Sequence, residues 1–222
     1  MTIATSAKPR QRRDPATARR NAVRDFKRAA ILRAAQDAFA TFGLEGATIR
    51  TIAQTAGYTA GAVYSYYPTK EAIYADILAH SLSALRGAVE AAAREAPTDE
   101  ERVRAAIRAF FVYYRTHPQE LDLGFYLFQG LRPRGLTPEL DRALNSRFIA
   151  VLMRIRSTLA RYGRLSNAMM HRETVATLCH ISGVLLLANT GRLKTLDADP
   201  AVLVEHYIDS LVARLQSLRI SA

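Results

Sequence analysis

The chain has 222 residues, of which 49% are hydrophobic, and it carries a formal net charge of +11 with a single cysteine. This length allows one large or two small domains, and the modest numbers of prolines and glycines favour a folded, mostly helical protein. The longest apolar run, 181–188, is too short to span a bilayer, and no apolar signal core follows Met1, so we expect a cytoplasmic protein without a membrane partner.

The basic charge is concentrated at the N-terminus. Residues 1–28 contain nine basic and two acidic side chains, a formal charge of +7, and the other 194 residues carry +4. A basic, proline-containing segment buries little apolar surface, so we expect residues 1–23 to form a disordered arm.

Apolar residues at helical spacing predict a first helix over about 24–42, which ends at Gly43. Its expected inward face contains Ile31, Leu32, Ala35, Ala38, Phe39 and Phe42. A long fourth helix, 69–95, is expected to link the N-terminal part to the rest of the chain.

Two short helices joined by a tight turn are expected between these long ones. Thr48 is the predicted N-cap of the second helix, which stops at Gly57, and Thr59 is the predicted N-cap of the third, which ends before Pro68. This pattern is typical of a helix-turn-helix, in which one helix enters the major groove of DNA. Beside such a motif, we expect the arginines between Arg19 and Arg28 to contact DNA phosphates; the alternative is a solvated tail that aids solubility.

The stretch from Ile31 to Leu78 resembles the tetracycline-repressor (TetR-type) family of bacterial transcription regulators. The matching positions are Ile31 to Ala35, Phe39, Phe42, Gly43, Thr48, Ile52, Ala53, Ala56, Gly57, Gly61, Val63, Tyr64, Tyr67, Lys70 and Glu71. Tyr58, Thr59 and Tyr67 depart from the residues usual in that family, which leaves the base preference open.

The resemblance implies a role for each matching residue at a DNA surface. Contacts to phosphates are implied for Thr48, Tyr64, Tyr66 and Lys70. Contacts to base edges are implied for Thr59, Ala60 and Ala62, beside Gly61. Arg50 is either a contact to the DNA backbone or a solvated charge. Tyr67 is expected to be a packed core aromatic.

Caps and prolines bound five further helices in the remainder of the chain. They are expected over about 98–117, 120–131, 137–162, 168–193 and 199–218. The result is an all-α fold of about nine helices, with a helix-turn-helix domain at 24–68 and a ligand-binding and dimerisation domain at 69–222. Cys179 lies in an apolar stretch of this domain, where we expect a buried, unreactive thiol.

Apolar seams on the last two helices are expected to pair with a second copy of the chain, and the alternative is a core within one chain. The residues assigned to this dimer interface are Leu178, Leu185, Val204, Ile208, Leu211 and Leu215. A homodimer would place two recognition helices on a pseudo-palindromic operator.

Aromatic and polar residues between the fifth and eighth helices are candidates for an effector pocket, although an aromatic stripe of this kind is more often core. They are Tyr113, Tyr114, Phe125, Tyr126, Phe128, Gln129 and His180. The main hypothesis is therefore a dimeric repressor that a small molecule releases from DNA.

Two other hypotheses remain. A DNA-binding or architectural regulator without an effector would have no such cavity. An enzyme is disfavoured because the sequence has no metal-ligand spacing, no glycine-rich phosphate loop and no Gly-x-Ser-x-Gly, so no catalytic residue, cofactor or metal is assigned.

Overall fold

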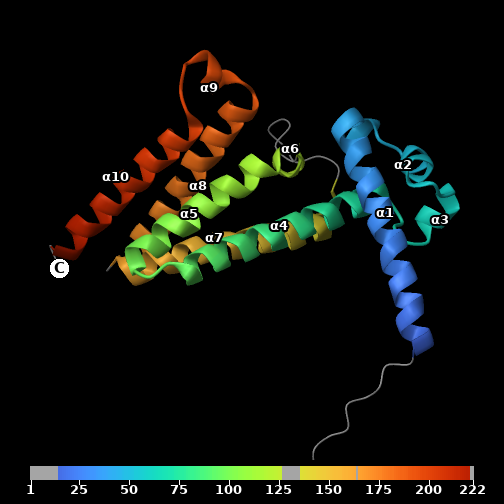
Figure 1. Ribbon diagram of the computed structural model, residues 1–222, viewed down its shortest axis with the longest axis horizontal. Helices are drawn as coiled ribbons and strands as arrows, with labels where there is room; N and C mark the ends of the chain where they lie inside the picture. Colours follow the sequence, from blue (N-terminus) through green and yellow to red (C-terminus); the bar gives the residue numbers. More distant parts are fainter. Residues whose placement is uncertain (1–14, 127–135, 164, 221–222) are drawn as a thin grey trace, which may run out of the picture. The chain divides into compact units, whose positions relative to one another are not determined.

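The computed structural model describes residues 15–126, 136–163 and 165–220, and the regular structure in these ranges is entirely helical, which confirms the all-α prediction. The helices are α1 (Pro15–Gly46), α2 (Ile49–Ala56), α3 (Ala60–Tyr64), α4 (Lys70–Glu95), α5 (Asp99–Thr116), α6 (Pro118–Tyr126), α7 (Pro138–Tyr162), α8 (Asn167–Asn189), α9 (Arg192–Thr195) and α10 (Pro200–Ile220) (Figure 1). Within those ranges, none of the helices combines the length and the apolar character needed to cross a bilayer.

The described helices number ten rather than nine because the helix expected over 168–193 is broken. Gly191 adopts a left-handed conformation (φ 71°), which ends α8 and starts the short α9. Glycine reaches this conformation at little cost, so the break is encoded at that residue. The chain divides into two compact units, residues 1–73 and 74–222, and α4 begins in the first unit and continues in the second.

The core of the first unit forms where α1 packs on the two short helices. Ile31, Ala35 and Phe39 of α1 are buried together with Ile52 of α2 and Val63 of α3. This is the inward face that helical spacing predicts. Phe42 is the exception, because Gly43 (φ 67°, ψ 173°) interrupts the helix there; Phe42 is 55% exposed, and Leu44 is buried instead.

The N-terminal half of α1 corrects the prediction of a disordered arm. Residues 15–23 are helical, and residues 19–29 are exposed along their whole length, so this part of α1 extends beyond the core. Alanine and arginine are strong helix formers and Pro15 occupies the first turn, which explains a helix despite the high charge. Residues 1–14 of the predicted arm lie outside the described residues.

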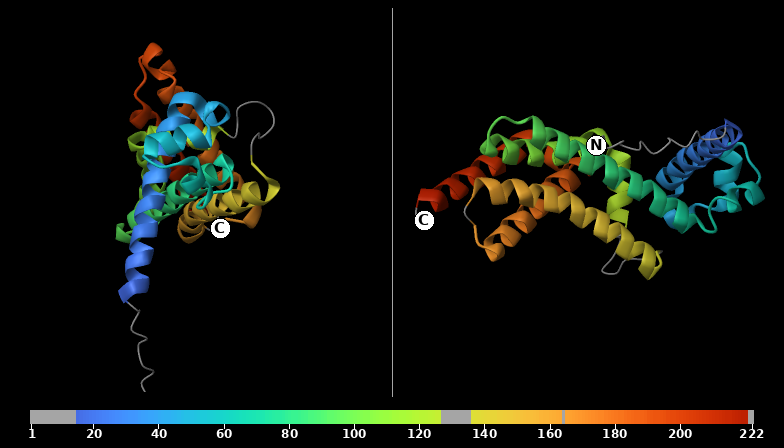
Figure 2. Two further views of the ribbon diagram at one scale, coloured as in Figure 1. Left: turned by 90° about the vertical axis from the view of Figure 1, so that its right-hand side faces the viewer. Right: turned by 90° about the horizontal axis from the view of Figure 1, so that it is seen from below.

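All the helices of the second unit contribute side chains to its core, most of them from α4, α5, α7, α8 and α10. Figure 2 shows the course of these helices in two further views. Five of the six residues assigned to the dimer interface lie in this core: Leu185, Val204, Ile208, Leu211 and Leu215 are at most 1% exposed, and Leu178 packs against them partly buried. These side chains therefore form the core of one chain and not a surface between two copies. Helical spacing identifies the apolar face of α10 but not the element that covers it.

The exposed face of α8 lies opposite the face that packs into the core of the second unit. It carries Val175, Cys179 and Leu186, which are exposed, and Gly183, which is half-buried. The prediction of a buried thiol at Cys179 is therefore wrong. No charged residue occurs between Glu173 and Arg192, so the part of α8 that follows Glu173 lacks the charges that usually mark a solvated face.

Candidate DNA-binding surface

The turn between α2 and α3 is held by the caps that the sequence predicts. The Thr48 hydroxyl accepts a hydrogen bond from the backbone N–H of Thr51 at 3.0 Å and starts α2. Gly57 ends α2 in a left-handed conformation (φ 74°, ψ 28°). The Thr59 hydroxyl then accepts from the N–H of Ala62 at 3.2 Å and starts α3. Local chemistry alone therefore produces a helix-turn-helix here.

The short helix α3 presents a surface of small side chains. Val63 faces inward and is fully buried, whereas Thr59 and Gly61 are exposed and Ala60 and Ala62 are half-buried. A Cβ added at Gly61 would have no neighbour within 4 Å, so the packing of this chain does not require glycine at that position. The surface can therefore be approached closely from outside.

Three tyrosines follow this surface and differ in burial. Tyr64 is 56% exposed, Tyr66 is half-buried and Tyr67 is 6% exposed, which places Tyr67 in the core as expected. The Tyr67 hydroxyl accepts a hydrogen bond of 2.9 Å from Nε of Arg28 on α1. The sequence does not reveal this pairing, since the two residues are 39 positions apart.

Lys70 has partners within the unit. Its Nζ donates to the carbonyl oxygens of Glu45 at 2.9 Å and Ala47 at 3.0 Å, in the link between α1 and α2. These hydrogen bonds give Lys70 a structural role in joining α4 to the link between α1 and α2. Its role as a phosphate ligand stays a prediction. Arg50 is exposed in the first turn of α2 and also stays a prediction.

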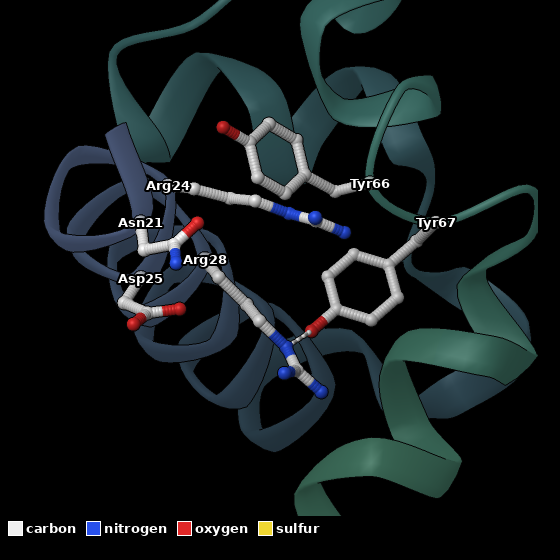
Figure 3. Close-up of a pocket in the computed structure, with 6 residues that line it drawn as sticks. All are labelled: Asn21, Arg24, Asp25, Arg28, Tyr66 and Tyr67. Carbon is white, nitrogen blue, oxygen red and sulfur yellow. Dashed lines mark hydrogen bonds between the residues drawn. The ribbon is translucent and has the colours of Figure 1, made fainter. Parts of the chain in front are cut away.

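A row of cations on α1 adds to this surface. Arg20, Arg24 and Arg28 are spaced four residues apart and lie on the same helical face as the buried Ile31 and Ala35. Where α1 extends beyond the core, this face changes from apolar to basic. Two of these arginines line a notch of about 400 Å³ with Asn21, Asp25, Tyr66 and Tyr67 (Figure 3).

The residues assigned to an effector pocket are not all brought together. Tyr114 is buried in the core of the second unit, and the Tyr113 hydroxyl donates to Oε2 of Glu120 at 2.6 Å. Burial raises the pKa of both tyrosines above the ordinary value, and the Glu120 carboxylate adds to the rise at Tyr113. His180 instead stacks on Tyr207 of α10, with ring centroids 4.3 Å apart.

The remaining candidates for the effector pocket are Phe125, Tyr126, Phe128 and Gln129, and their side chains are not among the described parts of the chain. The backbones of Phe125 and Tyr126 end α6, and Phe128 and Gln129 lie outside the described residues. Among the described residues, no three His, Cys, Asp or Glu side chains are grouped as metal ligands would be. A smaller groove of about 170 Å³ lies between α4 and α7, where Leu82, Ser83 and Arg86 face Ser146, Arg147 and Ala150.

Residues 31–77 match the family model described as "Bacterial regulatory proteins, tetR family". The HTH-type transcriptional activator FasR of Mycolicibacterium smegmatis is 29% identical over 126 residues, which cover 55% of this chain and 58% of that protein. The match thus spans less than two thirds of that relative's length.

Solved structures extend the likeness to most of the chain. The regulatory protein SCO4313 has a TM-score of 0.73 at 18% identity, covering 87% of this chain and 98% of that one. FadR from Bacillus subtilis, solved in complex with stearoyl-CoA, has a TM-score of 0.66 at 18% identity, covering 83% and 97%. At such identities these matches establish a shared fold.

Proposed function

Because the chain belongs to the tetR family of bacterial regulatory proteins, we propose that this DNA-binding transcriptional regulator is a homodimeric repressor that a small molecule releases from a pseudo-palindromic operator. The observation that carries the proposal is the surface of α3. It combines small side chains, the capping threonine Thr59 and flanking tyrosine hydroxyls with a basic face on α1. Major-groove entry requires small groups toward the bases and donors or cations toward the phosphates.

The roles divide along this surface. Thr59, Ala60 and Ala62 lie along base edges, with Gly61 allowing close approach. Thr48, Tyr64 and Tyr66 donate hydroxyl hydrogen bonds to phosphates, and Arg50 and Lys70 add positive charge. Removal of a phosphate contact weakens the binding of all DNA sequences alike, whereas removal of a base-edge contact changes which sequence is preferred.

The test is selection of bound duplexes from fragmented genomic DNA, followed by a salt series on the selected sequence. A pseudo-palindrome whose affinity falls steeply with salt supports the proposal. Tyr66→Phe should then weaken selected and random duplexes alike, and Ala62→Ser should change the base preference. Equal binding of every fragment by the unmodified chain would contradict operator recognition.

The homodimer is supported by the exposed face of α8. Val175 and Leu186 are 40% and 46% exposed, and Gly183 between them leaves open space where a Cβ would stand. A charge-free helical face with a glycine in its middle suits close packing against the same face of a second copy, related by a two-fold axis. A dimer would present two copies of α3 to two half-sites.

The effector site we propose is the groove between α4 and α7. The guanidinium groups of Arg86 and Arg147, together with Ser83 and Ser146, suit the anionic end of a ligand. Its 170 Å³ is smaller than typical ligand sites of roughly 300 Å³ or more, so binding requires the two helices to separate. A ligand that binds the separated state better shifts α4, and a coupling of about 1–3 kcal/mol changes operator affinity about 5- to 150-fold.

Stearoyl-CoA is a suitable first probe, because FadR from Bacillus subtilis was solved in complex with it. We expect it to release DNA from the unmodified chain and not from the variant Arg86→Ala/Arg147→Ala. Release from both proteins alike would move the site elsewhere. If no acyl-CoA or other anionic metabolite in a screen changes DNA affinity, the anionic effector is contradicted, and a regulator without an effector is favoured.

A further inference from the structure

The notch at the side of the first unit combines α1 with the segment after α3 (Figure 3). Arg24 reaches alongside the ring of Tyr66, and Arg28 reaches the hydroxyl of Tyr67. Asp25 also lines the notch, so its charged groups are two guanidiniums and one carboxylate, a net charge of +1. A cationic notch beside a phenolic hydroxyl is suited to an anion.

The position of Arg28 is fixed by the fold rather than by chance. Tyr67 is held by the core at 6% exposure, and its hydroxyl accepts from Nε of Arg28 at 2.9 Å. This bond holds one edge of the guanidinium at the notch and reduces the freedom of a long side chain that is otherwise on an exposed part of α1. A phenylalanine at position 67 would fill the same core space without this bond.

The notch is the end of a row and not an isolated feature. Arg20, Arg24 and Arg28 repeat every four residues, which corresponds to about 6 Å along the helix. A row of cations at regular intervals suits a polymer with repeated negative charges, whereas a single small anion needs only one of them. The row also leads to Tyr66, two residues after the end of α3.

We propose that Arg24, Arg28 and Tyr66 bind one backbone phosphate of DNA in this notch, and that the Tyr67 hydroxyl positions Arg28 for it. The site rests on the proposed function, because it places α1 on the strand beside the groove that α3 enters. It gives affinity without sequence information, since phosphate contacts are the same at every base pair. Tyr67 is a positioning residue, and it does not touch the DNA.

The test measures the salt dependence of binding to a selected duplex and to a random-sequence duplex. In the variant Arg24→Ala/Arg28→Ala, the slope of log affinity against log salt should fall by about 1, as expected for the loss of one phosphate contact. Both duplexes should be affected alike. Arg33→Ala is the matched control, because Arg33 is an exposed arginine on the outward face of the same helix. Asp25→Asn should tighten binding, because it removes a negative charge from the notch.

A double-mutant cycle tests the role of Tyr67. Tyr67→Phe should weaken binding roughly 3- to 10-fold in the native chain, as expected for the loss of one hydrogen bond of ordinary strength. The same change should have no effect in the Arg28→Ala background. An equal loss in both backgrounds would mean that Tyr67 acts through the core and not through Arg28, and circular dichroism melting of each variant checks the fold.

The outcomes separate this site from the proposed function. If the unmodified chain binds no duplex, the proposed function fails. If it binds but Arg24→Ala/Arg28→Ala matches Arg33→Ala in slope and affinity, only the notch is overturned. The DNA assignment is also overturned if inorganic phosphate raises the melting temperature of the unmodified chain alone while the DNA slopes are equal.

Discussion

The side-chain ammonium of Lys70 donates a hydrogen bond to the backbone carbonyl oxygen of Ala47 at 3.0 Å. It also donates to the carbonyl of Glu45 at 2.9 Å. These carbonyls lie where α1 ends and α2 begins, and Lys70 is the first residue of α4. A cation at the N-terminus of a helix opposes the helix dipole, so the two carbonyl acceptors explain why a lysine is stable there.

Lys70→Met therefore tests a structural role against a phosphate contact. The variant keeps most of the unbranched side chain but removes the ammonium group that makes both hydrogen bonds. This loss should lower the free energy of unfolding of the first unit by about 1–3 kcal/mol. Urea denaturation followed by circular dichroism measures this loss, and Lys70→Arg, which retains donors, is the control. A loss of DNA affinity without any loss of stability would mean that the lysine acts on phosphate alone.

The sequence predicts features that depend on local chemistry. Thr48, Gly57 and Thr59 cap the two short helices as expected, because capping needs only a hydroxyl or a residue free to adopt positive φ. Prediction from the sequence fails where the outcome depends on which element of the fold covers an apolar face. The apolar stripe of α10 is in the core, and the helix formers of residues 15–23 outweigh their charge.

The DNA surface could be predicted only in part for the same reason. The outward residues of α3 follow from the position of Val63 in the core, which periodicity gives. The contact between Arg28 and Tyr67 does not, because it joins residues far apart in sequence through the packing of α1 on the segment after α3. Basic residues near position 28 are visible in the sequence, but their meeting with particular tyrosines requires the fold.

Gly61→Ala should have opposite effects on stability and on DNA binding. Glycine inside a helix is less stable than alanine by roughly 0.5–1 kcal/mol, and a Cβ at this position would meet no atom within 4 Å, so the variant should be more stable. The added methyl group faces outward on α3, so operator affinity should fall. Thermal unfolding and fluorescence anisotropy with the selected duplex measure the two effects. Unchanged affinity would mean that DNA does not approach this helix closely.

Acid should destabilise the second unit through Glu100. A hydrogen bond from Arg104 at 3.0 Å holds the pKa of Glu100 below the ordinary glutamate value. Desolvation opposes this lowering of the pKa, and hydrogen bonds from the Tyr162 hydroxyl and the Gln216 amide, each at 3.1 Å, add to it. A carboxyl with a lowered pKa contributes stability above its unfolded pKa and loses it as pH falls through the folded pKa. Stability should therefore decline as pH drops below the ordinary glutamate value.

Urea unfolding across this acidic range measures the dependence on pH. Glu100→Gln should flatten it, because the variant has no proton to bind at that position. Glu95→Gln, a change at an exposed glutamate at the end of α4, is the control and should retain the slope of the unmodified chain. The same slope in Glu100→Gln would assign the acid dependence to other carboxylates.

The exposed face of α8 should be covered when two chains associate, and Cys179 on that face reports it directly. As the single cysteine of the chain, it reacts with a maleimide wherever its thiol is accessible. We expect fast labelling in dilute solution and slow labelling at concentrations where sedimentation shows a dimer. Gly183→Arg should keep the chain monomeric, because it places a charge in the middle of the charge-free face without a clash inside its own chain.

Gly87→Arg provides the matched control for this last variant. Gly87 is an exposed glycine within α4 and, like Gly183, has open space where a Cβ would stand. The control should therefore form dimers and bind the pseudo-palindrome like the unmodified chain. Gly183→Arg should bind it more weakly, because a monomer contacts one half-site only. A dimeric Gly183→Arg with rapidly labelled Cys179 would place the interface on another face of the second unit.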